Sequence, residues 1–386
     1  MKFIPVNQPL LNGNEKRYLN ECIDSGWISS EGPFVKEFES KFAERHGRKH
    51  GIAVTNGTAA LKCAADALDL KKGDEVIVPS FTIICCVTAI LEAGATPILV
   101  DCDPITFNSS PEQIVGAITA RTKAIMLVHI YGLPVDADPI LKIANDNGIK
   151  VIEDVAEVIG LNYKERPCGS LGQISTFSFY PNKHITTGEG GMILTDCDII
   201  ADKCRSSRNL CFQKKRRFYH EQIGWNYRMT NLQAAVGLAQ FERLDEFIYK
   251  KHRIGELYSD LLKDFPNVQI PLSKTNYASN IYWVYGIVLL DEEGHDALSM
   301  IKKFESVKIE TRPFFYPMHL QPVFRKMGMF KNESHPNSER LAKQGFYLPS
   351  GVGIKEEEIE IVAEYLGKFL KNSSFSKTKS FESLRF

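Results

Sequence analysis

The chain has 386 residues, which is long enough for a large buried core and for more than one typical domain. Its 47 Lys and Arg residues balance 47 Asp and Glu residues, so nothing in the net charge favours nucleic acid or an anionic membrane as a partner. Its nine cysteines form no C-x-x-C pair, and we expect them to be mostly small buried residues in a reducing compartment.

The N-terminal stretch gives no sign of export. The first residues, MKFIPVNQPLLNGNEK, lack the apolar segment of a signal peptide, because Pro, Asn and Gln interrupt it. No apolar run in the chain is long enough to span a bilayer. We therefore expect a cytoplasmic protein.

Short β-branched runs alternate with helix-like stretches from about residue 50 to 195. Near-continuous apolar runs separated by helical patterns are typical of a sheet that is covered on both faces. The predicted strands are 51–55, 75–79, 96–101, 124–129, 150–154, 175–180 and 191–195, and the predicted helices between them include 58–70 and 136–147. This βαβ pattern predicts a largely parallel α/β domain.

The pattern changes after residue 231. A helix is expected over 231–244 and a longer helical stretch to about residue 264, followed by strands (IYWVYGIVLL) mixed with helices such as 355–370. The sequence thus predicts a large α/β domain over residues 1–240 and a smaller α+β domain over 241–372. The Ser- and Lys-rich tail, 373–386, is expected to be disordered.

Open α/β sheets bind ligands at the carboxyl ends of their strands, and polar residues follow several predicted strands. Asn56-Gly57-Thr58 stands between a strand and a helix, whose free N–H groups suit a phosphate. Gly57 lets the backbone approach a ligand closely, and Thr58 adds a hydroxyl. An ordinary turn with a helix N-cap would use the same residues, so this motif alone leaves both interpretations open.

Asp154 and Lys183 also follow apolar runs. A carboxylate at the end of VIED is costly to bury unless a cation or hydrogen bonds compensate it. The protonated pyridine nitrogen of pyridoxal phosphate is one such partner, and helix capping is the alternative role for Asp154. Lysines at strand ends shift their pKa readily and form Schiff bases, whereas a surface hairpin would leave Lys183 exposed. The Gly-rich turn after Lys183 is neither a P-loop nor a dinucleotide fingerprint, which disfavours a nicotinamide dehydrogenase.

Several motifs, in order along the chain, resemble those of the DegT/StrS-type sugar-nucleotide aminotransferases, a branch of the fold-type I pyridoxal-phosphate enzymes. The stretch N-K-x-I-T-T-G-E-G-G-M is similar to the cofactor-lysine signature of that family. The resemblance extends over about residues 5–369 and includes WISS (27–30), NGT (56–58), GDEVIVPS (73–80), VHIYG (128–132), EDVAE (153–157) and NYRMTN (226–231). It implies the fold-type I architecture, in which a large, mainly parallel sheet domain is followed by a smaller C-terminal α+β domain.

The resemblance implies a role for each matching residue. Lys183 is expected to bond to pyridoxal phosphate and to move the proton between the substrate carbon and the cofactor. Asp154 is expected to pair with the pyridine nitrogen, and Glu157 to lie near the ring hydroxyl. The other implied contacts are Gly57, Thr58 and Ser178 with the phosphate, Asn226 with the phosphate across a dimer interface, and Trp27, Ser29, Tyr316 and His319 with the substrate.

The implied reaction is a transamination. L-glutamate gives up its amino group, and the C4 ketone of a nucleotide-linked 4-keto-6-deoxyhexose receives it. WISSEG, TGEGGM, NYRMTN and RPFFYPMH are most similar to members that act on GDP-4-keto-6-deoxymannose, and UDP- or dTDP-4-keto-6-deoxyglucose is the alternative. A homodimer with shared active sites is implied, and no metal is expected.

Two positions bear on how far the family pattern applies. Ile83 follows Thr82 where many relatives carry an aromatic residue that stacks on the cofactor ring, so an aliphatic side chain would have to cover the ring. His184 stands beside Lys183, and a dehydratase branch of the family replaces the cofactor lysine with histidine. The I-T-T-G-E-G-G spacing assigns the lysine position to Lys183, which disfavours a sugar 3-dehydratase. Together with Asp154 and Glu157, the lysine also disfavours a non-catalytic regulator.

Overall fold

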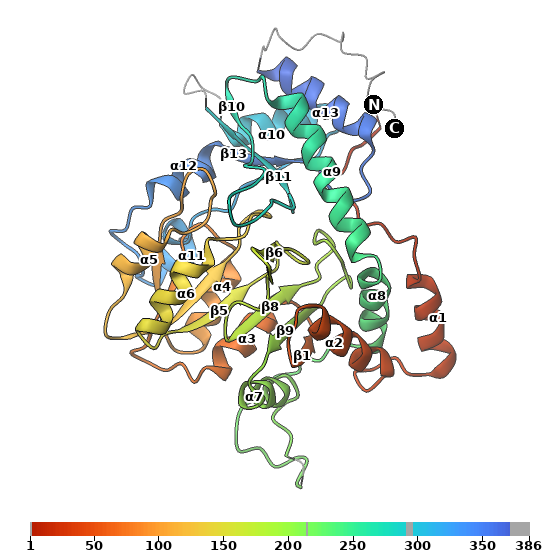
Figure 1. Ribbon diagram of the computed structural model, residues 1–386, viewed down its shortest axis with the longest axis vertical. Helices are drawn as coiled ribbons and strands as arrows, with labels where there is room; N and C mark the ends of the chain where they lie inside the picture. Colours follow the sequence, from red (N-terminus) through yellow and green to blue (C-terminus); the bar gives the residue numbers. More distant parts are fainter. Residues whose placement is uncertain (1, 214, 291–295, 371–386) are drawn as a thin grey trace.

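The computed structural model describes residues 2–213, 215–290 and 296–370. Two sheets organise the fold: a seven-stranded sheet in the middle of the molecule and a four-stranded sheet above it, beside the long helix α9 (Leu244–Leu262) (Figure 1). The tail predicted to be disordered, 373–386, lies outside the described residues. In the described part of the chain, no helix is both long and apolar enough to cross a membrane.

The larger sheet is mainly parallel. Its strand order is β1-β9-β8-β5-β4-β2-β3, and β9 runs in the direction opposite to the other six strands. The strands are β1 (His50–Val54), β2 (Glu75–Pro79), β3 (Thr96–Val100), β4 (Thr122–Val128), β5 (Lys150–Asp154), β8 (Ile174–Ser178) and β9 (Gly191–Thr195). All seven predicted strands are present, and the bounds of β2, β5 and β9 agree with the prediction. The α/β fold class is therefore confirmed.

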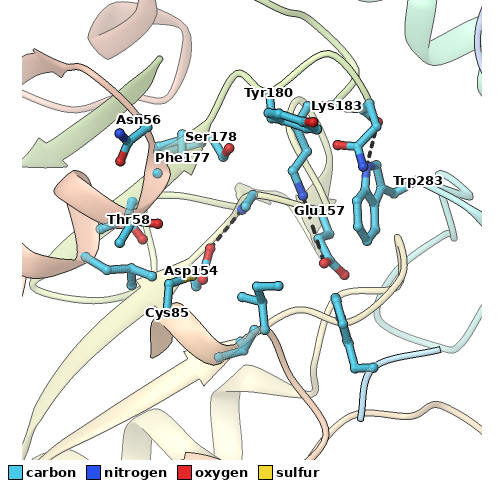
Figure 2. Close-up of a pocket in the computed structure, with 18 of the residues that line it drawn as sticks. Asn56, Thr58, Cys85, Asp154, Glu157, Phe177, Ser178, Tyr180, Lys183 and Trp283 are labelled. Atoms are coloured by element: carbon cyan, nitrogen blue, oxygen red, sulfur yellow. Dashed lines mark hydrogen bonds and ion pairs between the residues drawn. The ribbon is translucent and has the colours of Figure 1, made fainter. Parts of the chain in front are cut away.

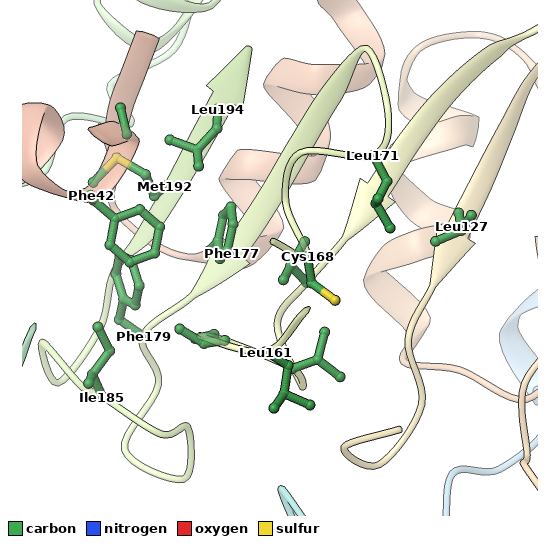
Figure 3. Packing of buried hydrophobic residues seen from close by; sticks show 14 of the residues in the cluster. Phe42, Leu127, Leu161, Cys168, Leu171, Phe177, Phe179, Ile185, Met192 and Leu194 are labelled. Atoms are coloured by element: carbon green, nitrogen blue, oxygen red, sulfur yellow. The ribbon is translucent and has the colours of Figure 1, made fainter. Parts of the chain in front are cut away.

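Helices cover both faces of this sheet. Successive strand residues point to opposite sides, so each strand contributes side chains to a core on either face. Ala53 of β1 faces a core that includes Phe42 of α2, whereas its neighbour Ile52 faces the core beneath α3. In the first of these cores, Phe42 packs edge-on against Phe177 and Phe179, with ring centroids 4.9 and 5.4 Å apart (Figure 3). The helices of this part are α1 (Glu15–Ser25), α2 (Pro33–Arg45), α3 (Gly57–Ala67), α4 (Ile84–Glu92), α5 (Pro111–Ala117), α6 (Ala137–Asp146), α7 (Asp198–Arg208) and α8 (Asn231–Phe241); β6 (Asn162–Tyr163) and β7 (Arg166–Pro167) form a small hairpin.

The smaller sheet is antiparallel, in the order β10-β11-β13-β12. Its strands and the remaining helices are β10 (Val268–Gln269), β11 (Tyr285–Leu289), α10 (Ala297–Ser306), β12 (Arg312–Pro313), η1 (Met318–Leu320), α11 (Pro322–Lys326), α12 (Pro336–Gln344), β13 (Gly345–Leu348) and α13 (Glu356–Phe369). The N-terminal segment joins this part, since Ile4 pairs with Ile309 and packs into the same core. The division near residue 240 stays a prediction.

An aromatic cluster joins the two sheets. Tyr131, which follows β4, packs against Phe314 with ring centroids 4.7 Å apart and against Phe315 at 4.9 Å. The Tyr131 hydroxyl also accepts a hydrogen bond of 2.8 Å from the Phe315 N–H. The C-terminal part of the chain is thereby held against the carboxyl ends of the parallel strands.

All nine cysteines are free thiols, and seven of them are buried. This agrees with the prediction that they are mostly small core residues.

Candidate active site

A pocket of about 520 Å³ opens where the parallel strands end. Val128 of β4, Asp154 of β5 and Ser178 of β8 line it from the larger sheet. Thr58 and Ser178 gather at one side of the pocket, and Lys183, Glu157 and Trp283 gather at the other (Figure 2). The pocket therefore has two ends of different chemistry.

The first end is the N-terminus of α3. Asn56 caps the helix by accepting a hydrogen bond of 2.8 Å from the Ala59 N–H, and Gly57 and Thr58, which begin the helix, line the pocket. Gly57 packs tightly against β8, since a Cβ at this position would lie 2.8 Å from the Ser178 Cβ. Thr58 and Ser178 add hydroxyls. Free N–H groups, the positive end of a helix and two hydroxyls suit an anion such as a phosphate.

Asp154 lies between the two ends of the pocket, at the end of β5. Its Oδ1 accepts a hydrogen bond of 3.1 Å from the Ala156 N–H, and its Oδ2 accepts one of 3.5 Å from the Cys86 thiol. Burial raises the pKa of this carboxyl above its usual value, although the Ala156 hydrogen bond and the charge of Lys183 oppose the shift. A cationic N–H placed in the pocket would stabilise the buried carboxylate.

The second end contains Lys183, which comes from the loop between β8 and β9. Its Nζ lies 4.0 Å from Oε1 of Glu157 and 3.6 Å from the centroid of the Trp283 ring. Burial lowers the pKa of Lys183, whereas Glu157 and Asp154 raise it. Burial raises the pKa of Glu157 to about 8, against the opposing effects of Lys183 and of a hydrogen bond of 2.7 Å from the Tyr131 N–H. A lysine that loses its proton easily can act as a nucleophile and as a proton carrier.

A family model described as the DegT/DnrJ/EryC1/StrS aminotransferase family matches residues 9–367. The chain belongs to this family. It is 42% identical over 369 residues to the GDP-perosamine synthase of Escherichia coli O157:H7, with 96% of this chain and 99% of that protein covered. It is also 42% identical over 367 residues to the GDP-perosamine synthase of Caulobacter vibrioides, with 95% and 98% covered. Among solved structures, an aminotransferase from Psychrobacter cryohalolentis is similar with a TM-score of 0.89 and 27% identity, covering 96% of this chain and 99% of that one. This member of the family is thus a pyridoxal-phosphate-dependent aminotransferase.

The pocket fits the cofactor of this aminotransferase family. The Thr176 hydroxyl, one of the groups that line the pocket, is buried and finds no hydrogen-bond partner among the described residues. Gly57 lets the start of α3 lie directly against Ser178, since a Cβ there would lie 2.8 Å from the Ser178 Cβ, so the helix N-terminus and the Ser178 hydroxyl stand side by side. The buried Asp154 carboxylate suits a pyridinium N–H. Three separate features thus agree with a phosphorylated pyridine ligand.

The predicted cofactor residues of this aminotransferase come together with one exception. Gly57, Thr58, Asp154, Glu157, Ser178 and Lys183 all line the pocket, and so does Ile83. Asn226 does not line it: the side chain is exposed, and its Oδ1 accepts a hydrogen bond of 2.9 Å from Arg228 Nε. An exposed position is what a contact with a second subunit would require, but the contact itself stays a prediction.

The four predicted substrate residues lie outside the pocket lining of the single chain. Trp27 and Tyr316 are about half exposed, and Ser29 is also exposed. His319 is fully buried, with Nδ1 2.8 Å from the Ser80 hydroxyl and Nε2 3.0 Å from Glu339 Oε1. Both ring nitrogens of His319 are thus engaged within its own chain, and the substrate contacts of all four residues stay predictions.

The WISSEG and NYRMTN motifs have a structural connection. Asn231 donates a hydrogen bond of 2.6 Å to the Trp27 carbonyl, accepts one of 2.9 Å from the Phe34 N–H, and gives its own N–H to the Ser29 carbonyl at 3.0 Å. Gly32 permits this contact, since a Cβ there would lie 2.1 Å from the Asn231 side chain. Part of each motif therefore serves to join the α1–α2 loop to α8.

Sequence reasoning missed the aromatic wall of the pocket. Tyr180, Trp283, Phe315 and Tyr347 all line it. Trp283 stands just before β11 in the run IYWVYGIVLL, and Tyr347 lies in β13, so both look like ordinary residues of a buried sheet. Only their position in the folded chain gives them a place in the site.

His184 and a second buried cluster complete the surroundings. Burial and the charges of Lys251 and Lys183 hold the pKa of His184 well below its usual value, and neither ring nitrogen has a partner among the described residues.

His129, Glu153 and Cys168 are close enough together to suggest a metal site. However, His129 Nδ1 accepts from the Val135 N–H, and the Glu153 carboxylate accepts three backbone N–H groups. These hydrogen bonds to the backbone give the cluster a structural role next to β5.

Proposed function

We propose that this enzyme transfers the amino group of L-glutamate to C4 of a nucleotide-linked 4-keto-6-deoxyhexose. The observation that carries the proposal is the position of the Lys183 amine, which lies inside the pocket beside Glu157 and within reach of a ligand that Asp154 and the α3 N-terminus would hold. The similarity to the two GDP-perosamine synthases supports GDP-4-keto-6-deoxymannose as the acceptor. The UDP- and dTDP-linked 4-keto-6-deoxyglucoses are the second candidates.

Each pocket residue has a proposed task. Gly57, Thr58 and Ser178 hold the phosphate of the cofactor, Asp154 keeps its ring nitrogen protonated, and Glu157 lies near its ring hydroxyl. Bound pyridoxal phosphate supplies an electron sink for the carbanion left when the substrate loses a proton. Lys183 anchors the cofactor. Once its amine is free, Nζ takes the proton from the substrate carbon and delivers it to the cofactor.

The retained lysine distinguishes this proposal from its rivals. A sugar 3-dehydratase of the same family carries histidine in place of the cofactor lysine, whereas here the buried His184 does not line the pocket. A non-catalytic regulator would have no use for a lysine whose amine lies in the pocket beside Glu157 and shares that pocket with Asp154. We therefore favour an active transaminase over either alternative.

We also propose that the enzyme is a homodimer with shared active sites. The exposed positions of Asn226, Trp27 and Ser29, outside the pocket of their own chain, support a role at the pocket of a second subunit. The nine free thiols suit a reducing compartment, and we expect the enzyme to act in the cytoplasm on a precursor for glycan biosynthesis.

Covalent trapping tests the cofactor lysine. Borohydride reduction of the purified protein should attach pyridoxal phosphate to the peptide that contains Lys183. Lys251 is the internal control, because burial also lowers its pKa, to about 7, but its amine donates to the carbonyls of Trp283 and Ser350 and does not line the pocket. An adduct on Lys251 or on any other lysine would contradict the proposal.

Substrate assays then test the reaction. Glutamate should convert the bound cofactor to its amine form, seen as loss of the long-wavelength absorbance, in the parent protein and not in Lys183→Ala. The amine form should transfer its amino group to the GDP-linked keto sugar faster than to the UDP- or dTDP-linked sugars. A protein that binds the cofactor but does not respond to glutamate would support the regulator instead.

A further inference from the structure

The indole of Trp283 contacts Lys183 in two ways. Its ring face lies beneath the lysine amine, with Nζ 3.6 Å from the ring centroid (Figure 2). Its Nε1–H donates a hydrogen bond of 2.7 Å to the carbonyl of Asn182, the residue directly before the lysine. One side chain thus holds both the amine of Lys183 and the backbone from which the lysine extends.

Trp283 is itself held firmly. Its carbonyl accepts a hydrogen bond of 3.1 Å from the buried amine of Lys251. Its ring packs beside Tyr131, with centroids 5.9 Å apart, and stacks near Phe315 at 6.4 Å. Only 6% of Trp283 is exposed, so the ring has little freedom to leave the lysine.

Opposing effects act on the protonation of the Lys183 amine. Burial favours the neutral amine, whereas the carboxylates of Glu157 and Asp154 favour the ammonium. His184, the following residue, is held neutral and adds no charge. An aromatic face attracts a cation, most strongly where water is excluded. The indole therefore adds to the groups that favour the ammonium.

We propose that Trp283 is a positioning residue that holds the protonated amine of Lys183 at the reacting centre. In this role the indole face binds the ammonium that forms when Lys183 takes the substrate proton, and the bond to Asn182 keeps the lysine from swinging away before the proton is returned. The inference rests on the proposed function, in which Lys183 carries that proton.

Fluorinated tryptophan gives a test, because fluorine weakens the negative electrostatic potential over the ring face and leaves the ring volume nearly unchanged. The full-length Trp27→Phe/Trp225→Phe variant, freed of cofactor, would be produced with tryptophan, 5-fluorotryptophan or 5,7-difluorotryptophan, so that only Trp283 differs. The rate at which an acylating reagent labels Lys183, followed by peptide mapping across pH, gives the pKa of its amine. The surface residue Lys49 in the same samples is the control.

Each fluorine should weaken the hold on the ammonium, so the pKa of Lys183 should fall stepwise and labelling at neutral pH should rise by about fivefold overall. Lys49 should not change. An unchanged pKa of Lys183 across the series would overturn the inference, because a purely structural ring would keep its packing. If the double variant does not fold, the same series in the parent sequence serves, since Trp283 is the tryptophan that lies over Lys183.

The two proposals fail in different experiments. The labelling series needs no turnover, so a graded shift without reaction toward glutamate would leave the Trp283 inference standing and would contradict the transaminase. A cofactor found on Lys183, with no graded shift of the Lys183 pKa, would support the proposed function and contradict the Trp283 inference. Trp283→Phe, which keeps a ring and loses the N–H, should retain more of the glutamate half-reaction than Trp283→Leu.

Discussion

The Nζ of Lys183 lies 4.0 Å from Oε1 of Glu157, and the side chains are 10% and 7% exposed. Burial moves the pKa of each group toward the other, since it lowers that of the lysine and raises that of the glutamic acid to about 8. Burial therefore reduces the difference between the two pKa values, which is useful for a lysine that must both accept and donate a proton.

Glu157→Gln should stabilise the cofactor-free protein more at pH 8 than at pH 5. The folded carboxyl keeps its proton up to a pKa of about 8, whereas the unfolded one loses it near 4.5, so the parent loses stability through this residue as the pH rises between those values. The gain at pH 8 should be on the order of 1 kcal/mol, because loss of the Lys183 contact offsets part of it. Urea unfolding at the two pH values measures it.

The exposed, pocket-lining Glu189 offers a matched control for that experiment. Glu189→Gln should change stability little and equally at both pH values. A stabilisation by Glu157→Gln that does not depend on pH would show that the folded carboxyl is already ionised at pH 5.

Gly57→Ala should weaken cofactor binding by about 10- to 100-fold, the effect of forcing a methyl group into a packed site. The new Cβ would lie 2.8 Å from the Ser178 Cβ and 3.1 Å from its Oγ, so either α3 or β8 must shift where the phosphate is expected. Titration of the cofactor-free protein measures the dissociation constant. Gly116→Ala, at a helical position with open space, should leave that constant unchanged. Equal affinities for parent and Gly57→Ala would place the phosphate elsewhere.

Ile83→Asp should lose cofactor on gel filtration, whereas Ile83→Tyr should retain it. Ile83 lines the pocket, and a carboxylate there would lose hydration beside the bound ring without gaining a cationic partner. The neighbouring Ile84 is also partly exposed but does not line the pocket, so Ile84→Asp is the matched control and should retain the cofactor. Retention by Ile83→Asp equal to that of the control would mean that Ile83 does not cover the ring.

Mixed subunits should reveal a shared site. Lys183→Ala and Asn226→Ala proteins should each be inactive, and subunit exchange between them should restore about a quarter of the parental activity, because half of the dimers regain one complete site. A mixture of Lys183→Ala with Asp154→Asn is the control and should stay inactive, since these residues line the same pocket of one chain. Failure of the Asn226 mixture after verified exchange would count against the shared site.

Local sequence patterns predicted the larger sheet well. The strands β2, β5 and β9 are buried runs of apolar residues bounded by polar or turn residues, and such runs carry their own signal. The two-residue strands β10 and β12 have no such signal, because their pairing depends on β11 and β13. The N-terminus of α12 is similar: Asp101 caps it by accepting from the N–H groups of Asn337 and Ser338, more than two hundred residues away in the sequence.

The residues of the site also fall into those that local sequence predicts and those that depend on distant parts of the chain. Lys183, Asp154 and Gly57 stand at strand ends or a helix start, where the type of residue and its position already indicate chemistry. Trp283 reaches the lysine only because β11 of the smaller sheet is packed over the larger one, and no local pattern predicts that contact. His319 shows the opposite case, a polar residue in a suggestive motif whose ring is used up by hydrogen bonds to Ser80 and Glu339.

The aromatic contacts of Tyr131 with Phe314 and Phe315 limit where the chain can be divided into separate fragments. A fragment ending near residue 240 would keep Lys183 and Asp154 but would lose Trp283, Phe315 and Tyr347 from the pocket wall. It would also expose the Tyr131 ring and the hydroxyl that now bonds the Phe315 N–H. Such a fragment should aggregate when expressed alone. An exchange of C-terminal halves between relatives should succeed only when the aromatic residues on both sides of this junction are transferred together.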